Sequence, residues 1–469
     1  MRYRSTRGEA PELGFEDALL AGLAGDGGLY LPTEWPVLAP DTIRDFTAAR
    51  YEDVAEAVMR PYLGADIDAT AFRTMIDESY AAFAHAAVAP LVQVAPNEWI
   101  LELFHGPTLA FKDVPMQLLA RLMDRALAQR GARVTIVGAT SGDTGGAAIE
   151  AFRGREAVDV FILHPKGRVS DVQRRQMTTA REDNIFNIAL EGTFDDCQAF
   201  VKALFNDPTR RSQLSLAGVN SINWARIMAQ VVYYFSAGAA LGAPDRKVSF
   251  SVPTGNFGDV FAGHIARRMG LPISELIVAT NQNDILARTI ATGRYEPLGV
   301  APSSSPSMDI QVSSNFERLL FELSGEDPTR VRALMGQLAQ QGHFALTADE
   351  HTRLRDAFLA ARADEGEMAA ALRGVHDASG YLLDPHTAVG VHAARAARKD
   401  CIAPMVTLAT AHPAKFPASV NAVIGEDPPV PGRLGQDLGA EERMTVLVND
   451  YTKVADFICD HSRVARMAA

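Results

Sequence analysis

One lysine of this chain lies in a turn that would change its chemistry. The turn, Phe104-His105-Gly106-Pro107-Thr108-Leu109-Ala110-Phe111-Lys112-Asp113, separates an apolar strand pattern from a helical pattern that begins near Met116. Apolar neighbours and the positive end of a helix dipole both disfavour an ammonium. We therefore expect Lys112 to carry a neutral amine, the form that condenses with a carbonyl group, and Asp113 to cap the helix. An ordinary surface lysine is the alternative that these residues alone leave open.

Two further turns between a strand and a helix are rich in glycine and hydroxyl groups. The first, 139–146, follows the apolar run 134–139, and the second, 253–259, follows the run 248–252. Backbone N–H groups at such turns bind carboxylates or phosphates. Neither turn has dinucleotide spacing or a Walker lysine, so a compact monophosphate is expected rather than NAD or ATP. Together with Lys112, the two turns suggest an aldehyde cofactor with its own phosphate, pyridoxal 5′-phosphate.

Composition narrows the class of protein. The chain has 469 residues, 47% of them hydrophobic and 22% charged, which is typical of a soluble enzyme of two or three domains. A net charge of −12 argues against nucleic-acid and membrane partners. Three dispersed cysteines without metal spacing, no run of 18 apolar residues and no apolar N-terminal segment predict a cytoplasmic protein without a metal site.

The order of the patterns predicts an α/β fold. Residues 1–95 are mainly helical in pattern, and from about 96 strands and helices alternate as in βαβ units, whose ligands collect at the carboxyl ends of the strands. The charged helical stretch 331–373 is expected to be a solvated connection. A last buried strand, 402–408, leads into Thr410-Ala411-His412-Pro413-Ala414-Lys415, and the strand 445–448 and a helix close the chain.

The turn around Lys112 closely resembles the pyridoxal-lysine motif of the threonine synthase family. Nine further blocks resemble that family in its order: 5–8, 26–30, 139–146, 164–170, 220–226, 253–259, 314–318, 380–388 and 410–416. They span nearly the whole chain, and ten blocks in order are far more specific than any single glycine loop. The resemblance implies a fold-type II pyridoxal-phosphate enzyme, with two open, twisted, mainly parallel sheets flanked by helices and a helical N-terminal region.

The resemblance also implies domains and an activity. Residues 1–95 would form the N-terminal region, 96–245 a smaller α/β domain with Lys112 and the substrate loops, and 246–469 a larger α/β domain with the cofactor-phosphate loop, with approximate boundaries and the option of interleaving. The implied reaction converts O-phospho-L-homoserine and water into L-threonine and phosphate by γ-elimination and β-addition, the last step of threonine biosynthesis. The enzyme would be a carbon–oxygen lyase acting on phosphate.

Residue roles follow from the same resemblance. Lys112 would hold the cofactor as a Schiff base and move protons as general base and acid. The remaining cofactor contacts would come from Asp143, Gly255, Asn256, Phe257, Gly258, Asp259 and Thr410. The substrate carboxylate would meet Thr140, Ser141 and Thr144, and the substrate phosphate Asn220, Ser221, Asn223 and Arg226. Arginine suits a phosphate because its planar fork donates two hydrogen bonds and stays charged.

Several points stay open at this level. Most fold-type II enzymes have asparagine where this chain has Asp143, and an aspartate beside a phenolate and a carboxylate is expected to be repelled or protonated. His412 and Lys415 are equally compatible with structural and catalytic roles. A monomer and a homodimer are both compatible with the chain. A dehydratase or phospho-lyase on the same fold, and a non-catalytic binding protein, are the rival functions.

Overall fold

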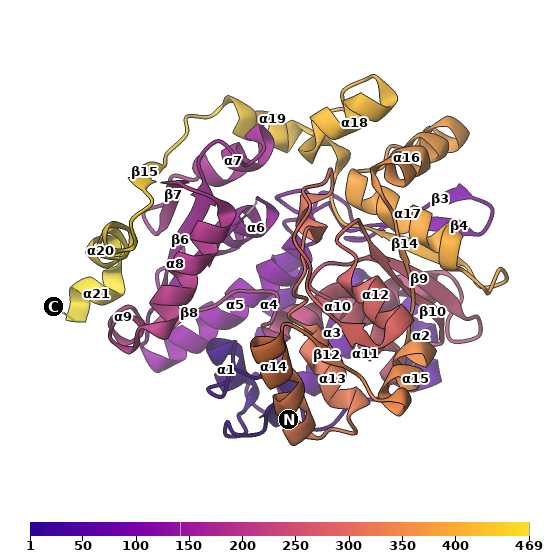
Figure 1. The fold of residues 1–469 in the computed structure, drawn as a ribbon, viewed down its shortest axis with the longest axis horizontal. Helices are drawn as coiled ribbons and strands as arrows, with labels where there is room; N and C mark the ends of the chain where they lie inside the picture. The colour runs from indigo at the N-terminus through magenta and orange to yellow at the C-terminus, as the bar shows by residue number, and fades with distance from the viewer. Residues whose placement is uncertain (141, 469) are drawn as a thin grey trace.

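Two sheets lie side by side and are surrounded by helices in the computed structural model, which describes residues 1–140 and 142–468 (Figure 1). The larger sheet has the order β13-β10-β9-β14-β4-β3, with β13 Leu359–Arg362, β10 Ile273–Thr280, β9 Val248–Pro253, β14 Met405–Ala409, β4 Glu98–Glu102 and β3 Leu91–Ala95. The smaller has the order β15-β7-β6-β5-β8, with β15 Thr445–Val448, β7 Ile185–Glu191, β6 Val158–Pro165, β5 Val134–Ala139 and β8 Leu216–Ala217. We call these sheets with their helices the large lobe and the small lobe.

Both sheets are mainly parallel, and β3 with β4 is the antiparallel pair of the large sheet. The small lobe has α6 (Asp143–Phe152), α7 (Asp171–Thr178), α8 (Phe194–Asn206), α9 (Pro208–Leu214), α20 (Tyr451–His461) and α21 (Arg463–Ala468) around its sheet. The helices near the large sheet are α11 (Gly258–Arg268), α12 (Ile285–Thr292), α13 (Phe316–Leu323), α14 (Pro328–Gln341), α15 (Ala348–Ala357), α16 (Glu365–Ser379), α17 (Pro385–Ala397) and α18 (Pro417–Ile424), whereas α19 (Gly432–Gly439) packs on α7 of the small lobe. This is the α/β architecture that the sequence predicts.

The N-terminal region is mainly helical, as expected. It contains β1 (Tyr3–Ser5), α1 (Phe15–Ala21), β2 (Tyr30–Pro32), α2 (Pro40–Asp45), the 3-10 helix η1 (Phe46–Ala48), α3 (Tyr51–Leu63) and α4 (Ala69–Tyr80). Short elements elsewhere are β11 (Arg294–Tyr295), β12 (Phe344–Ala345), η2 (Pro306–Met308) and η3 (Pro413–Lys415). Among the helices described, none is long and apolar enough to cross a membrane.

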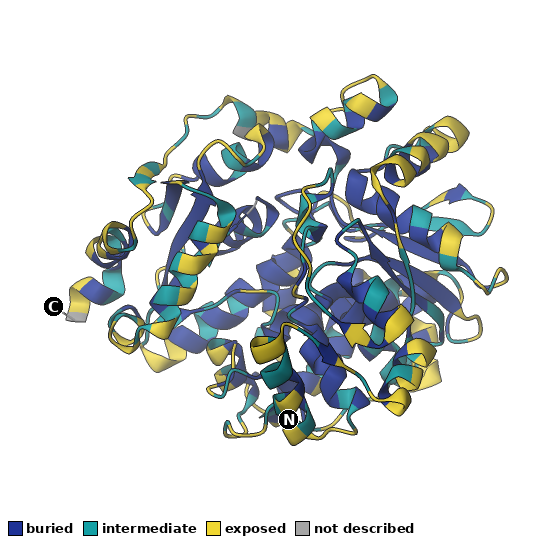
Figure 2. Cartoon of the chain, in the orientation of Figure 1, coloured by how far each residue is buried: buried dark blue, intermediate teal, exposed yellow. Residues whose placement is uncertain are grey.

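One helix, α10 (Trp224–Ala240), is the centre of the core. Nearly all of its residues are buried, because α3, α5 (Asp113–Arg130) and α11 pack around it (Figure 2). A helix that is apolar on most of its circumference is stable only in such an enclosed place. Polar residues on α10 therefore stand out, and Arg226, Gln230 and Tyr233 form one stripe at i, i+4 and i+7.

The sheets cross the approximate boundaries at 96 and 246, by the kind of interleaving that the sequence analysis allowed. β3 and β4, on the two sides of residue 96, pair with each other, and β4 pairs with β14 near the other end of the chain. β15, expected in the larger domain, pairs with β7 of the small lobe, and Figure 1 shows the C-terminal segment passing from α18 across to β15. Hydrophobic patterns identify strands but not their partners, so the sequence could not place these segments.

The stretch 331–373 also differs from its expected role as a solvated connection. It contains β13, which pairs in parallel with β10 and extends the large sheet at its edge. Leu334 of α14, Leu354 of α15 and Leu372 of α16 are buried. Charged residues on the outer faces of these amphipathic helices dominate the pattern and hide the short strand between them.

Close packing of α10 on α11 generates a prediction. A Cβ on Gly263 would lie 2.8 Å from Cε1 and 2.9 Å from Cζ of Tyr234. Because the rigid ring cannot move without disturbing the core, Gly263→Ala should lower the free energy of unfolding by about 1–3 kcal/mol. Urea denaturation of the purified protein measures this change.

The matched control is Gly336→Ala in α14, where an added Cβ meets nothing within 4 Å. Alanine favours a helix over glycine, so this variant should gain up to about 1 kcal/mol. Equal effects of the two substitutions would contradict the packing argument.

Candidate active site

The turn that carries Lys112 joins β4 to α5 and is closed by the first residue of that helix. Asp113 Oδ2 accepts a hydrogen bond from the Thr108 amide at 2.8 Å, and Oδ1 accepts one from the Thr108 hydroxyl at 2.7 Å. A Cβ on Gly106 would lie 2.4 Å from the Asp113 Cβ, so the turn requires glycine there. Asp113 is therefore not the cap expected from the sequence, because its carboxylate reaches back to close the turn.

The amine of Lys112 is buried at the carboxyl end of the large sheet. Nζ lies 3.3 Å from Asp143 Oδ2 and 4.8 Å from the centre of the Phe111 ring. Burial lowers the pKa of Lys112, and the Asp143 carboxylate opposes that shift only in part. The charges of Lys415 and Arg226 lower this pKa further. The direction is the one expected from the sequence for an amine that must be neutral.

Thr410 follows β14 and is tied to the Lys112 turn through the backbone. Ala110 and Ala411 form an antiparallel bridge, and the Phe111 amide donates to the Thr410 carbonyl at 2.8 Å. Since β14 lies between β4 and β9, the loops after these three strands meet at one edge of the sheet. Thr410 thus lies at the same carboxyl end of the large sheet as Lys112 and the second glycine loop.

The second glycine loop, 255–259, connects β9 to α11. Phe257 is the N-cap of α11 in a left-handed conformation, with φ of 64°, and no side chain caps this helix. The N–H groups of its first turn are therefore left for a ligand. A Cβ on Gly255 would lie 3.1 Å from the Ser307 carbonyl oxygen, and one on Gly258 would lie 3.2 Å from Asn315 Nδ2. The tight surroundings explain why the loop contains glycine at both positions.

A neighbouring segment, 313–315, braces this loop. The Ser313 hydroxyl donates to the Gly255 carbonyl at 2.8 Å, and the Asn315 amide donates to the Asn256 carbonyl at 3.1 Å. The Ser314 hydroxyl donates to the Asn256 side-chain oxygen at 3.3 Å. Backbone carbonyls of the loop are thus turned toward this segment, and the amides on the other side remain for an anion.

Asp259, the last residue of the loop, is engaged by α10. Its Oδ1 accepts hydrogen bonds from the hydroxyls of Tyr233 and of Tyr234, the latter at 3.2 Å. Burial raises the pKa of Asp259 to about 7, against the opposing effect of the two tyrosines. Oδ2 is buried without a hydrogen-bond partner among the described residues. The side chain of Asp259 therefore links the glycine loop to the polar stripe of α10.

Asp143 opens α6 at the carboxyl end of β5, and donors from several elements surround it. Oδ1 lies 2.9 Å from Lys415 Nζ and 2.9 Å from Gln173 Nε2, while Oδ2 accepts from the Ser307 hydroxyl at 3.2 Å. Burial alone would raise the pKa of Asp143, but Lys415 and then Lys112 hold it well below its ordinary value. The expectation of a repelled or protonated Asp143 does not hold for this geometry, because two lysine side chains face the carboxylate.

Lys415 is the main residue that the sequence-based site lacks. It is fully buried on η3, and Nζ donates to the Thr108 carbonyl at 2.7 Å as well as to Asp143. Its neighbour His412 has Nδ1 accepting from the Ala414 amide at 3.1 Å, and burial lowers its pKa to about 4. His412 is thus neutral, whereas Lys415 contacts the site directly. The signal in the sequence that could have found Lys415 is that a basic residue lies inside the block 410–416, which resembles the family.

The first glycine loop is held by Thr140. Its hydroxyl oxygen accepts from the amides of Gly142 at 3.0 Å and Gly145 at 2.9 Å, which folds the loop over the end of β5. Thr144 is half-buried on the first turn of α6. Ser141 lies outside the described residues. Thr140, one of the residues expected to bind the substrate carboxylate, therefore also holds the loop in its conformation.

Arg226 is buried without a carboxylate partner among the described residues. Nη1 donates to the Val219 carbonyl at 3.1 Å, and Nε has no hydrogen-bond partner there. Burial lowers the pKa of Arg226 to about 10. Buried guanidinium groups are normally paired, so a free one indicates a site for an anionic ligand.

The other expected phosphate contacts divide into two kinds. Asn223 is buried and both ends of its amide are occupied, by the Leu19 carbonyl at 2.9 Å and the Ala225 amide at 3.1 Å, so it caps α10. Asn220 is exposed and Ser221 is half-buried. The Ser221 carbonyl accepts from Asn315 Nδ2 at 3.2 Å, which connects this segment to the glycine loop of β9.

A second layer of polar residues stands behind Ser307. The Ser307 amide donates to His386 Nε2 at 3.2 Å, and His386 Nδ1 lies 2.8 Å from Asp384 Oδ1. Because Nε2 accepts, the proton of the neutral ring is on Nδ1 and is donated to Asp384. His386 is thus buried and structural, and it positions the Ser307 that contacts Asp143.

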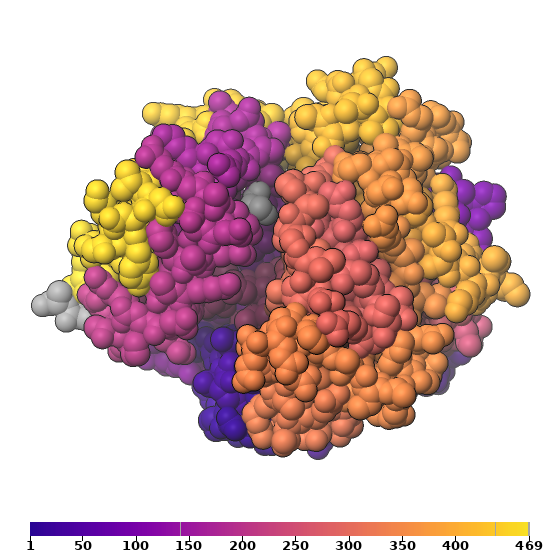
Figure 3. Space-filling model, viewed as in Figure 1, coloured from indigo at the N-terminus to yellow at the C-terminus, as the bar shows by residue number. Residues whose placement is uncertain are grey.

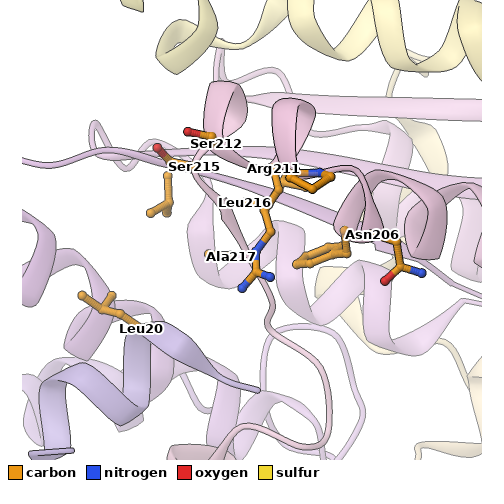
Figure 4. Close-up of a pocket in the computed structure, with 10 residues that line it drawn as sticks. Leu20, Asn206, Arg211, Ser212, Ser215, Leu216 and Ala217 are labelled. Carbon is orange, nitrogen blue, oxygen red and sulfur yellow. The ribbon is translucent and has the colours of Figure 1, made fainter. Parts of the chain in front are cut away.

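The molecular surface has a furrow between the lobes and a separate cavity. Figure 3 shows the furrow between the α6–α8 side and the segment near residue 300. A cavity of about 610 Å³ lies instead at the amino end of β5, with Leu20 of α1 on one side and Asn206 and Arg211 of α8 and α9 on the other (Figure 4). Val134 also lines it, at the opposite end of the strand from Thr140. This cavity is not part of the lysine site.

The residues present fit pyridoxal 5′-phosphate. A buried amine with a lowered pKa suits its aldehyde, the uncapped N-terminus of α11 suits its phosphate, and Thr410 lies on the edge between them. Fold and site together define a fold-type II pyridoxal-phosphate enzyme. A family model described as "Pyridoxal-phosphate dependent enzyme" matches residues 86–410.

Two further family models, "Threonine synthase N terminus" and "Threonine synthase, C-terminal", match residues 2–80 and 387–458. The chain belongs to the threonine synthase family. It is 54% identical to a threonine synthase of Pseudomonas aeruginosa over 462 residues, which are 98% of each chain.

Solved structures agree with this assignment. The pyridoxal-phosphate-bound threonine synthase of Brucella melitensis is 58% identical and superposes with a TM-score of 0.96 over 99% of this chain and 100% of that one. The threonine synthase of Escherichia coli is 31% identical, with a TM-score of 0.83 over 98% and 100% of the two chains. The fold class, the cofactor and the kind of enzyme expected from the sequence are therefore confirmed.

The state of Arg226 generates a prediction about stability. A buried cation without a partner destabilises the folded protein, so Arg226→Met should raise the free energy of unfolding by about 1–3 kcal/mol in the absence of ligands. Urea denaturation of the apoprotein measures it. A loss of stability would show that Arg226 is compensated within the protein.

The matched control is Arg318→Met. Arg318 is equally buried, but its guanidinium donates to the Tyr30 carbonyl at 3.2 and 3.1 Å, the Ile222 carbonyl at 2.6 Å and the Asn315 side chain. Removal of the guanidinium leaves these buried acceptors without a donor, so the free energy of unfolding of this variant should fall by about 3–5 kcal/mol. The two arginines are thus expected to change stability in opposite directions.

Proposed function

We propose that this chain makes L-threonine and phosphate from O-phospho-L-homoserine and water, with Lys112 as the catalytic residue and Arg226 as the main contact of the substrate phosphate. The observation that carries the proposal is a pair of buried nitrogen groups at one site: the Lys112 amine, whose pKa is lowered by burial, and the Arg226 guanidinium, which has no carboxylate partner among the described residues. An amine that binds an aldehyde and an arginine that binds a phosphate are the two requirements of this reaction.

The cofactor would be held by groups from three loops. The amides of Gly255, Asn256, Phe257, Gly258 and Asp259 would bind its phosphate at the N-terminus of α11. Thr410 would meet the ring nitrogen with a neutral hydroxyl. Asp143 would lie near the ring on the side of the small lobe. When bound, pyridoxal phosphate supplies an electron sink that stabilises negative charge on substrate carbons.

The chain's own residues would do the rest. Lys112 would take the proton from the substrate Cα and return protons later in the reaction. Thr140, Ser141 and Thr144 would bind the substrate carboxylate, and Asn220 and Ser221 would join Arg226 at its phosphate. Asn223 would act by capping α10, because its side chain is already occupied. We further propose that the phosphate, once released from Cγ, stays near Arg226 and takes part in proton transfer.

The rival activities need different substrates. The substrates of a serine or threonine dehydratase carry no phosphate and would leave the buried Arg226 without a counterion. A phosphorylated amino acid would provide that counterion. A phospho-lyase would share the phosphate site but release 2-oxobutyrate. A purely binding role would not require the reactive state of the Lys112 amine. We also propose a cytoplasmic location, and leave monomer and homodimer as alternatives.

The activity is tested by incubating the purified protein with pyridoxal phosphate and O-phospho-L-homoserine. Threonine and phosphate should appear in a 1:1 ratio, measured by amino-acid analysis and a phosphate assay, and Lys112→Ala should abolish both products. Lys247→Ala is the control, because Lys247 is exposed and outside the site. Release of 2-oxobutyrate together with phosphate would show that the protein is a phospho-lyase and not a threonine synthase.

The role of Arg226 is tested by kinetics of Arg226→Ala. Loss of a buried charged contact costs about 2–5 kcal/mol, so kcat/KM should fall by roughly 30-fold to several thousand-fold. If the phosphate also takes part in proton transfer, kcat at saturating substrate should fall as well. Unchanged kcat with a raised KM would limit Arg226 to substrate binding.

A further inference from the structure

Two lysines share one buried carboxylate in the site. Asp143 lies 2.9 Å from Lys415 Nζ and 3.3 Å from Lys112 Nζ, and side-chain exposures of the three residues are 3%, 1% and 11%. If both lysines were protonated, this trio would carry an uncompensated positive charge, with the buried guanidinium of Arg226 nearby. Burial penalises such an excess, so one of the two lysines is expected to be neutral.

The contacts show which lysine is the main partner of Asp143. The Lys415 ammonium has two good acceptors, Asp143 Oδ1 at 2.9 Å and the Thr108 carbonyl at 2.7 Å. Lys112 has one longer contact to Asp143 and the face of Phe111. Lys415 is therefore the closer and better-bonded partner of the Asp143 carboxylate, and Lys112 is the lysine with the weaker contact.

The Thr108 carbonyl gives Lys415 a second effect. Thr108 is the residue whose amide and hydroxyl bind Asp113, so Lys415 is attached to the same turn that presents Lys112. The second lysine thus joins three elements: η3 after β14, the turn after β4, and α6 of the small lobe. The charge of Lys415 pairs with Asp143, and the length of its side chain allows it to reach both Asp143 and the Thr108 carbonyl.

We propose that Lys415 is a positioning residue that takes Asp143 as its own ion-pair partner and thereby leaves the Lys112 amine neutral and able to react with the cofactor aldehyde. The lone pair of the neutral amine adds to the aldehyde carbon, and a C=N bond forms with release of one water. This inference rests on the proposed role of Lys112. It also explains why an aspartate is compatible with a position where most fold-type II enzymes have asparagine: here the negative charge is cancelled within the site.

The charged groups that face Lys112 come from four elements. Asp143 of α6 favours its protonation, as does Asp259 of α11 when ionised, while Lys415 of η3 and Arg226 of α10 disfavour it. Asp143 is the carboxylate within contact distance of Nζ. Removal of Lys415 would therefore give Asp143 to Lys112 alone and raise the pKa of Lys112.

The test measures Lys112 directly in the apoprotein. The protein is acylated with trace acetic anhydride at pH 6 to 10, and modification of the Lys112 peptide is followed by mass spectrometry, with exposed Lys247 as internal standard. In Lys415→Met, modification of Lys112 at pH 7.5 should be at least about tenfold slower than in the wild type, since each unit of pKa changes the neutral fraction tenfold. Binding of pyridoxal phosphate to the apoprotein, followed by absorbance, should slow in parallel.

Two further variants separate charge from structure. Asp143→Asn removes the anion but leaves Lys415, so Lys112 should be modified as fast as in the wild type or faster. The double variant Asp143→Asn/Lys415→Met leaves neither charge and should return the Lys112 rate close to the wild-type value. A merely structural role of Lys415 would not be rescued by the second substitution.

The outcomes are decisive in each direction. An unchanged Lys112 profile in Lys415→Met, or slow modification that persists in the double variant, would overturn the proposal. If Lys415→Met does not fold, the Asp143→Asn variant decides, because slower modification of Lys112 there would contradict it. The assay needs no substrate, so failure to make threonine would count against the proposed function and not against this inference.

Discussion

The site depends on one buried carboxylate that joins the two lobes. Asp143 stands at the carboxyl end of the small sheet, and its partners Lys112, Lys415 and Ser307 come from loops at the large sheet. An ionised carboxylate in an enclosed place requires several donors, and these donors must come from both sides of the furrow. The requirement to satisfy Asp143 therefore fixes the relative placement of the loop that presents Lys112 and the glycine loop that leads into α6.

The second constraint is the central helix. Asn223 caps α10, and the stripe of Arg226, Gln230 and Tyr233 reaches from the Val219 carbonyl to Asp259. Because the remaining faces of α10 are enclosed by apolar neighbours, this stripe cannot turn away from the site. The blocks 5–8 and 26–30, which contain no chemistry of their own, serve the same end: Arg7 pairs with Glu317 at 2.9 Å, and Arg318 of the same helix holds the segment before α10.

Local patterns were sufficient for most elements and for the residues in the loops. β5 and β15 have the bounds that periodicity indicates, and the loops of Lys112, Gly255 and Thr410 follow the strands expected. The pairing of the strands could not be predicted from the sequence, because β4 and β15 each join a sheet built from distant parts of the chain. The state of Asp143 was beyond reach for the same reason: its pKa is set by Lys415, 272 residues further on, and spacing carries no information about that contact.

The arrangement of charges explains why this site is costly to maintain and why it stays reactive. Among the described residues, Arg226 has no carboxylate partner and Asp259 Oδ2 has no hydrogen-bond partner, so two ionisable groups are buried with incomplete compensation. An anionic ligand at Arg226 would supply the missing counter-charge, so its binding would relieve an existing penalty. Lys415 is the exception, since its ammonium is satisfied without any ligand. A group that is already satisfied does not change partners when a ligand arrives, and that constancy is what allows it to set the state of the lysine beside it.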